Sequence, residues 1–224
     1  MANRSSTILQ RTTRLALVGA IGFLLLACRA ASDPTTAPAS DAGGVDTNGS
    51  FIGSNDIVQI EPLSLNQALA PVRMAIPELG MDLPVIPMGW RVVQADGERA
   101  TVWDVPESEV GWHVNSAGVG GAGNMIFSGR QADGDTVFAP LALGNVVEGQ
   151  DVLVTDTDGL TFVYRVGEVS EPIPISGATD EESARVLAYA GSDGVPKLTL
   201  VTGWPDFTTT HRVHAVADFV GVIK

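Results

Sequence analysis

Two arginines are the side chains whose type and spacing in this sequence most clearly suggest chemistry. Arg130 follows Gly129, and Arg212 follows His211 near the carboxyl end. A guanidinium group presents a planar fork of N–H donors that matches the two oxygens of a carboxylate. If both arginines meet in one pocket, the sequence therefore predicts recognition of carboxylate-bearing ligands. Pairing of Arg130 with a nearby acid such as Asp206 would give that arginine a structural role instead.

Two hydroxyl groups offer an alternative, covalent chemistry. Ser128 and Thr202 are candidate nucleophiles, and a hydroxyl needs a base within hydrogen-bond reach. His214 lies two residues beyond Arg212, so on a strand both share one face about 7 Å apart. The sequence therefore leaves open a hydrolase that pairs Ser128 or Thr202 with His214. His214 as a partly exposed strand residue without catalytic function is the other interpretation.

A catalytic thiol and a metal site are both disfavoured. Cys28 is the only cysteine, so the rest of the chain has no thiol, and no intramolecular disulfide can form. His211 and His214 could bind a metal ion together with Asp206, but residues three apart in a strand face opposite sides. We therefore expect neither a metal nor a cofactor.

The amino-terminal residues 1–28 are typical of a bacterial signal peptide. Three arginines, Arg4, Arg11 and Arg14, precede an apolar run at 15–27 that is short for a membrane-spanning helix. The run ends in Leu-Leu-Ala-Cys, which resembles a lipobox, the motif in which Cys28 would be lipidated. The sequence thus predicts an extracytoplasmic protein anchored to the membrane through Cys28. Simple cleavage after Ala27 and a retained anchor are the alternatives.

Composition indicates how the remaining chain is divided. Residues 29–65 are rich in Ala, Ser, Asp, Thr, Gly and Pro, a composition that predicts a disordered tether. Residues 66–224 contain enough apolar positions for one folded domain, which we expect to be monomeric. The formal net charge of −13 argues against nucleic acid as a partner, because phosphate contacts require clustered Lys and Arg.

The elements that must position the candidate residues are mostly strands. Residues 197–204 alternate between two apolar or β-branched faces, which predicts a strand covered on both sides, and 212–223 form the return strand. Further strands are expected at 72–77, 81–86, 152–155 and 160–166, and one helix at 180–190 that Asp180 could cap. Glycine-rich turns between short strands predict a mainly β protein, a closed barrel of about eight strands with one or two short helices.

Several motifs resemble the sortase family, the cysteine transpeptidases of bacterial surfaces, in particular its classes D, E and F. Residues 199–203 read Thr-Leu-Val-Thr-Gly where the family has Thr-Leu-x-Thr-Cys, and the next strand opens with Arg212 as in the family. Residues 123–130 read Gly-Asn-Met-Ile-Phe-Ser-Gly-Arg, similar to the family's Gly-Asn-x-x-x-x-Gly-His. The resemblance covers residues 72–224 and implies a sortase-type barrel.

The resemblance also implies roles that this chain has lost. Gly203 stands where the family has its cysteine nucleophile, and Arg130 stands where it has its catalytic histidine, so only Arg212 keeps its identity. An arginine does not release its proton near neutral pH and cannot replace the histidine as a base. We therefore expect no thiol transpeptidation.

The sequence thus favours a pseudo-sortase that binds peptide or carboxylate-bearing ligands at the cell surface. Its expected binding residues are Arg130, Trp204, Arg212 and His214, with a peptide or surface protein as the ligand. A cysteine-independent hydrolase or transpeptidase, and a structural surface domain without a ligand, are the two alternatives.

Overall fold

We analysed a computed structural model of the protein, which describes residues 44–45, 51–52, 56–64, 66–95, 97–132 and 135–223. All of these belong to one compact unit that spans Ser40–Lys224. The predicted signal peptide with Cys28, and the first part of the predicted tether, lie outside the described residues. Within the described part of the chain, no helix has both the length and the apolarity needed to cross a membrane.

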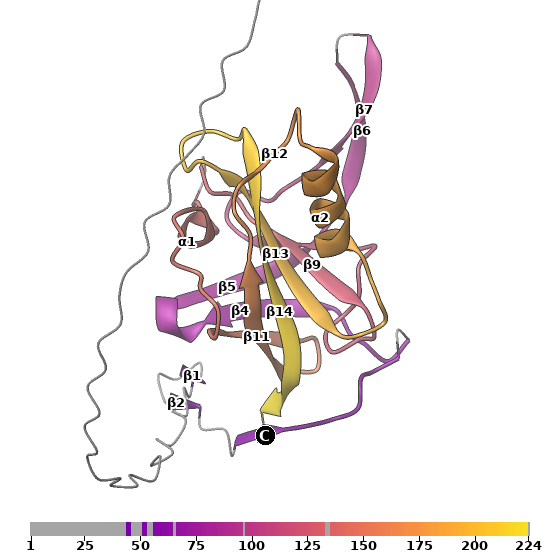
Figure 1. Ribbon diagram of the computed structural model, residues 1–224. Helices are drawn as coiled ribbons and strands as arrows, with labels where there is room; N and C mark the ends of the chain where they lie inside the picture. The colour runs from indigo at the N-terminus through magenta and orange to yellow at the C-terminus, as the bar shows by residue number, and fades with distance from the viewer. Residues whose placement is uncertain are drawn as a thin grey trace, which may run out of the picture. The chain divides into compact units, whose positions relative to one another are not determined.

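Eight strands form a closed barrel (Figure 1). They follow one another in the order β11-β10-β4-β5-β8-β9-β13-β14, and β14 pairs with β11 to close the sheet. The prediction of a mainly β, closed barrel of about eight strands with two short helices is thereby confirmed. The barrel strands are β4 Pro71–Ile76, β5 Met81–Met88, β8 Val110–His113, β9 Asn124–Ser128, β10 Asp151–Asp156, β11 Thr161–Val169, β13 Lys197–Trp204 and β14 His211–Ile223.

The structure also contains smaller elements in addition to the eight barrel strands. The short strands β3 Ile57–Val58 and β12 Ile173–Pro174 both pair with β14. The others are β1 Gly44–Val45, β2 Phe51–Ile52, β6 Trp90–Ala95, β7 Glu98–Trp103, the 3₁₀ turn η2 Pro77–Leu79, and the helices α1 Ala139–Ala142 and α2 Asp180–Ala190.

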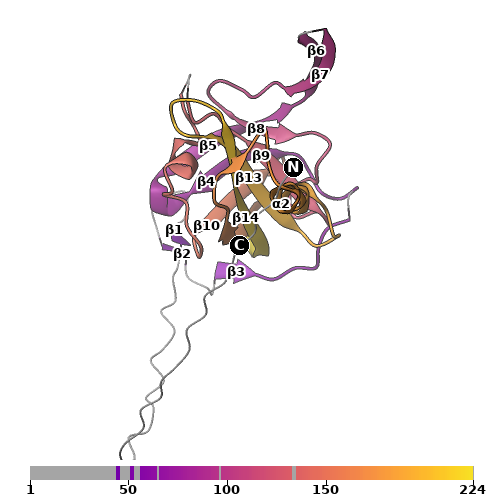
Figure 2. The ribbon, with the colours of Figure 1, turned by 45° about the horizontal axis from the view of Figure 1, so that its top comes forward.

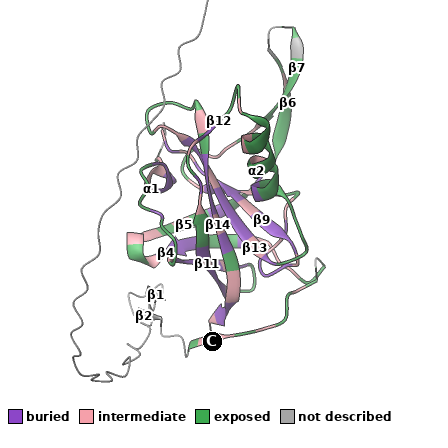
Figure 3. Cartoon of the chain, viewed as in Figure 1, coloured by how far each residue is buried: buried purple, intermediate pink, exposed green. Residues whose placement is uncertain are grey.

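The hydrophobic core fills the barrel interior because strand residues point alternately to its two faces. On β13 the alternate residues Leu198 and Leu200 are at most 1% exposed and belong to the main core cluster. Phe127 of β9 and Ala215 of β14 join them from the neighbouring strands. Figure 3 shows the buried residues concentrated on these central strands. The intervening residues of β13, such as Thr199 and Val201, point to the outer face of the barrel.

Proline is tolerated in β5 because the two halves of this strand pair with different neighbours. Pro84 pairs with Arg73 of the antiparallel strand β4, whereas Pro87 pairs with Trp112 of the parallel strand β8. Each proline therefore faces a single ladder, so its missing N–H removes a bond on one side of the strand only.

Helix α2 has the bounds expected from the sequence but a different N-cap residue. Thr179, not Asp180, is the N-cap: its hydroxyl accepts from the N–H of Glu182, while the Glu182 carboxylate accepts from the N–H of Thr179. Tyr189 is the buried residue of the helix, whereas Leu187 is 73% exposed. The aromatic side chain of Tyr189 therefore provides the buried contact of this helix.

The sequence analysis missed the hairpin formed by β6 and β7. These strands pair from Trp90 with Trp103 to the turn at Gly97, whose φ is +84°. The dipeptide Asp96-Gly97 is the sequence signal that could have identified this turn. Figures 1 and 2 show the hairpin extending away from the barrel, and Figure 3 shows that it is largely exposed.

Some residues before position 65, within the predicted tether, contact the barrel. Ile57 and Val58 pair with the end of β14, and Leu63 forms an isolated bridge with Gly121. The N–H of Leu63 also donates to the carbonyl of Gly120 at 2.9 Å. The chain from residue 57 therefore already contacts the barrel.

Candidate functional site

A cleft of about 1250 Å³ lies on the outer face of strands β8, β9, β13 and β14. Its floor follows from the strand registers: Ser128 lies opposite Val201, Val201 opposite His214, and Gly203 opposite Arg212. Because every second strand residue points to the same face, these side chains meet although they come from three strands. The fold therefore brings Ser128, Gly203, Arg212 and His214 into one cleft, together with Arg130.

Three segments form the walls of this cleft. Helix α2 contributes Val186 and Tyr189, the base of the hairpin contributes Trp103, and the loop between β13 and β14 contributes residues 207–209. Figures 1 and 2 both show α2 lying over the sheet beside β13 and β9.

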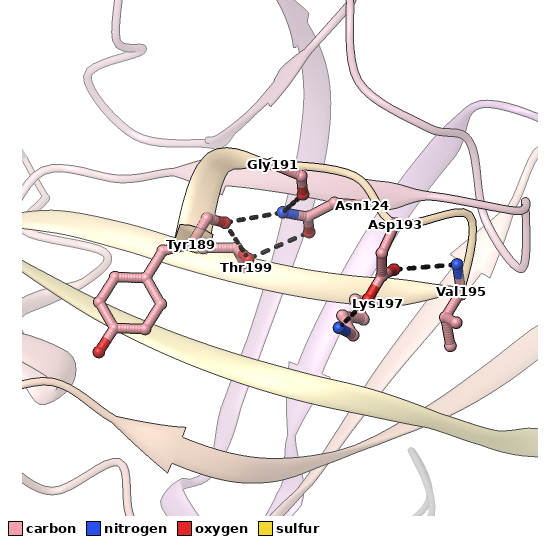
Figure 4. Close-up of polar contacts among 7 residues, drawn as sticks. All are labelled: Asn124, Tyr189, Gly191, Asp193, Val195, Lys197 and Thr199. Atoms are coloured by element: carbon pink, nitrogen blue, oxygen red, sulfur yellow. Dashed lines mark hydrogen bonds and ion pairs between the residues drawn. The ribbon is translucent and has the colours of Figure 1, made fainter. Parts of the chain in front are cut away.

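Helix α2 is fixed to the floor through the carbonyl groups at its carboxyl end (Figure 4). The side-chain amide of Asn124 donates to the carbonyls of Tyr189 and Gly191, at 2.7 and 3.1 Å. The hydroxyl of Thr199 lies 3.0 Å from both the Tyr189 carbonyl and the Asn124 side-chain oxygen. These contacts satisfy carbonyls that have no partner within the helix, so the wall is held in one position.

Gly203 lies in the cleft, but the volume beside it is occupied. A β-carbon on Gly203 would lie 2.7 Å from Cδ of Gln131 and from Oγ1 of Thr209. Gln131 is 6% exposed, and its amide donates to the Thr208 carbonyl at 2.9 Å and to the Thr209 hydroxyl at 2.8 Å. Gln131 was not predicted from the sequence, because its role depends on a contact with Thr208, which lies 77 residues later in the chain.

Arg130 also lines the cleft, but its guanidinium holds the backbone. Nη2 donates to the carbonyl of Val105 and Nε to that of Pro106, both at 3.1 Å. These bonds fix the segment between β7 and β8 against the site. The guanidinium therefore binds two carbonyls, whereas the sequence suggested an acid or a ligand as its partner.

Arg212 differs from Arg130 in having no hydrogen bond or ion pair to any residue that the structure describes. Its side chain is exposed toward the cleft, yet the surrounding protein lowers the pKa of its guanidinium by partial desolvation. A side chain on an open cleft keeps solvent on one side. Arg212 is thus a cation available to a ligand.

His214 is buried beneath α2, with 6% of its surface exposed. Its ring stacks on Tyr189 with the centroids 5.1 Å apart, and its Nδ1 has no hydrogen-bond partner among the described residues. Burial, with a smaller contribution from the charge of Arg212, lowers its pKa to about 4. No described hydrogen bond joins His214 to Ser128 or Thr202.

Ser128 is paired with a different histidine. Nε2 of His113 lies 2.7 Å from Oγ of Ser128, and both residues are 8% exposed at the cleft floor. The ring of His113 also packs against Trp103, with the centroids 4.1 Å apart. Burial lowers the pKa of His113 to about 4, so the imidazole is neutral at physiological pH. The sequence spacing gave no indication of this pair, since the two residues lie on neighbouring strands.

Thr202 and Trp204, the two remaining candidates, are not among the described residues that line the cleft. Thr202 is 3% exposed, and its hydroxyl donates to the Gly129 carbonyl at 2.8 Å. This hydroxyl is therefore part of a buried structural contact. Trp204 packs partly against the core and meets His211 edge to face at 5.3 Å. It does not line the described cleft, so Gln131 and not Trp204 fills the space beside Gly203.

The charge of the cleft contrasts with that of the whole chain. Its described lining contains Arg130 and Arg212 but no aspartate or glutamate, although the chain carries a formal net charge of −13. Among the residues placed by the structure, no cluster of three or more His, Cys, Asp or Glu side chains could hold a metal ion. The cleft is therefore a locally positive region of an acidic protein.

In a comparison with known protein families, residues 74–220 match the family described as the sortase domain. The chain belongs to the sortase family. The match begins in β4 and ends in β14, so it includes all the barrel strands and the whole cleft floor.

Solved structures similar to this sortase domain are themselves sortases. Sortase C1 from Streptococcus agalactiae is 19% identical with a TM-score of 0.48, and the match covers 66% of each chain. Sortase A from Listeria monocytogenes is 18% identical (TM-score 0.49; 70% of this chain, 90% of that one). A lid mutant of sortase A from Corynebacterium diphtheriae is 20% identical (TM-score 0.48; 74% and 87%). The comparison with curated proteins gave no match, and the family assignment rests on the family match alone.

Proposed function

We propose that this sortase domain is a pseudoenzyme that binds carboxylate-bearing ligands, in particular peptides, at the cell surface. The observation that carries the proposal is the charge of the cleft: Arg212 lacks a partner among the described residues, and the described lining contains no acid. A guanidinium on an open cleft whose described lining contains no acid attracts anions, so a bound anion would be stabilised there. A carboxylate can accept two parallel hydrogen bonds from one guanidinium.

Absence of transpeptidation is the second part of the proposal. The nucleophile position is Gly203, the histidine position is Arg130, and the guanidinium of Arg130 is engaged with two backbone carbonyls. Removal of a nucleophile and its base from a catalytic unit abolishes most of the rate enhancement. Binding through Arg212 remains, with the neutral pair of Ser128 and His113 as a polar neighbour.

The third part concerns localisation. We propose that Cys28 is lipidated and anchors the protein to the bacterial membrane on its outer side, as a monomer. The sequence before Cys28 supports this proposal, because it combines a basic start, a short apolar run and a lipobox-like end. Metabolic labelling with a palmitate analogue should mark the parent protein and not Cys28→Ser. Labelling of both the parent protein and Cys28→Ser would contradict lipidation at Cys28.

Calorimetric titration with matched peptides tests the ligand. Peptides with a free terminal carboxylate should bind, and their amidated counterparts should bind at least tenfold more weakly, since a charge-assisted hydrogen bond contributes about 1.5–3 kcal/mol. Arg212→Ala should abolish the difference between the two peptides, and Arg212→Lys should restore it in part because lysine lacks the fork. Equal affinity for both peptides in the parent protein would overturn the proposal.

A hydrolase that uses Ser128 with His113 is the second candidate, favoured by their 2.7 Å contact. It is weaker, because a base with a pKa of about 4 lies far below neutral pH and accepts a proton poorly. A fluorophosphonate probe should therefore leave the parent protein unlabelled. Labelling that Ser128→Ala removes would establish this candidate in place of the first.

A further inference from the structure

The space next to Gly203 in the cleft is filled, and the absence of a cysteine and a histidine does not by itself explain what fills it. Replacement of a cysteine by glycine would leave an empty volume at the floor of the cleft. Instead, a β-carbon at this position would clash with Gln131 and with Thr209 of the β13–β14 loop. Contacts of 2.7 Å to a β-carbon are shorter than van der Waals separation, so one of the groups would have to move.

Gln131 is held in this place by hydrogen bonds to the loop. Its amide nitrogen lies 2.9 Å from the carbonyl of Thr208, 2.8 Å from the hydroxyl of Thr209 and 3.4 Å from the carbonyl of Pro205. Because Gln131 is 6% exposed, its side-chain amide would be a buried donor without partners if these bonds were lost. The amide therefore resists displacement by a new side chain at position 203.

We infer that Gln131 is a positioning residue that takes the place of the missing nucleophile and fixes the β13–β14 loop as one wall of the cleft. Two consequences follow. A side chain at position 203 meets Gln131 more closely than Thr209, and Gln131 is buried whereas Thr209 is exposed, so restoring the family nucleophile requires a change at position 131 as well. The wall formed by residues 207–209 also has a fixed shape before any ligand binds, since Gln131 links it to the segment after β9.

Thiol reactivity tests the first consequence without any ligand. In a full-length Cys28→Ser background the introduced cysteine is the only thiol of the protein. Gly203→Cys should react with a disulfide reagent at least tenfold more slowly than Gly203→Cys/Gln131→Ala, and it should melt at a lower temperature than the double variant. Equal rates and equal melting temperatures for the two proteins would overturn the inference.

A neighbouring position provides the matched control. Val201 lies two residues away on the same face of β13, also lines the cleft, and makes no contact with Gln131 that the structure describes. Val201→Cys should therefore react at the same rate with and without Gln131→Ala. A comparable acceleration at both positions would mean that Gln131→Ala merely loosens the whole domain, and would reject a specific role.

Amide hydrogen exchange tests the second consequence. Gln131→Ala should accelerate exchange within residues 206–209 and leave the amides of β9 and β13 unchanged. Gln131→Asn, which keeps an amide on a shorter side chain, should give an intermediate rate if the hydrogen bonds to the loop are the cause. An unchanged loop in Gln131→Ala would show that Gln131 does not position the wall, whatever the outcome of the peptide titrations.

Discussion

His113 and Ser128 form a buried hydrogen bond across neighbouring strands, with Nε2 and Oγ 2.7 Å apart at the floor of the cleft. The pair resembles the start of a catalytic dyad, yet burial lowers the pKa of His113 to about 4. The imidazole is consequently neutral over the physiological pH range and a weak base. The pair is therefore better suited to form a fixed polar surface than to act as a nucleophile and base. Trp103 packs against the ring of His113.

Stability should fall as the pH decreases from about 6.5 to about 4. Both His113 and His214 have a pKa lowered from 6.5 to about 4, so in this window the unfolded chain binds more protons than the folded protein. Each shift corresponds to about 3 kcal/mol, present in full above pH 6.5 and lost by pH 4. Denaturant melts between pH 4 and 8 measure this slope. His113→Gln and His214→Gln should each make the dependence of stability on pH less steep; a flat profile in the parent protein would contradict the prediction.

Removal of the Ser128 hydroxyl should destabilise the fold modestly. Ser128→Ala leaves Nε2 of His113 without its partner in a buried position, which costs about 1–3 kcal/mol. Ser128→Thr keeps the hydroxyl and should recover part of the loss. Urea melts at pH 7 compare the three proteins, and unchanged stability in Ser128→Ala would show that water replaces the bond.

Replacement of Arg130 should affect the segment between β7 and β8. Arg130→Lys cannot reach the carbonyls of Val105 and Pro106 with two fixed donors, so a loss of about 1–2 kcal/mol is expected. Arg130→His, the family residue, should lose at least as much and should not produce cleavage of sorting-signal peptides. Melting temperature and a mass-spectrometric cleavage assay check both statements, and cleavage by Arg130→His would disprove the second.

Arg212→Ala should leave stability within about 0.5 kcal/mol of the parent value. Its guanidinium has no described hydrogen-bond or ion-pair partner, so the folded state loses little when it is removed. Measured together with the peptide titrations, this result would separate a ligand contact from a structural one. A loss above about 1 kcal/mol would instead indicate a structural role for this arginine.

Thr199→Val should loosen helix α2. The change keeps the shape of the side chain but removes the hydroxyl beside the Tyr189 carbonyl and the Asn124 side chain (Figure 4). We expect a loss of about 1–2 kcal/mol and faster amide exchange at the carboxyl end of α2. Thr208→Val, on the exposed loop, is the matched control and should change neither quantity; slow exchange retained in Thr199→Val would refute the anchoring role.

The sequence by itself determined the architecture. Leu198 and Leu200 alternate with Thr199 and Val201, and this period of two determines which side chains share a face of β13. The hairpin turn at Gly159, with φ of +85°, follows equally from local chemistry, because glycine adopts this conformation without strain. The resemblance of residues 123–130 and 199–203 to sortase motifs is likewise visible in the sequence alone.

The tertiary structure alone decided how the candidate residues are used. Arg130 and Arg212 look alike in the sequence, yet one donates to two carbonyls and the other is open to the cleft. Ser128 meets His113 and not His214, and Gln131 fills the volume beside Gly203. These pairings join residues 15 to 77 positions apart, so they depend on strand register and loop packing, which local propensities do not encode.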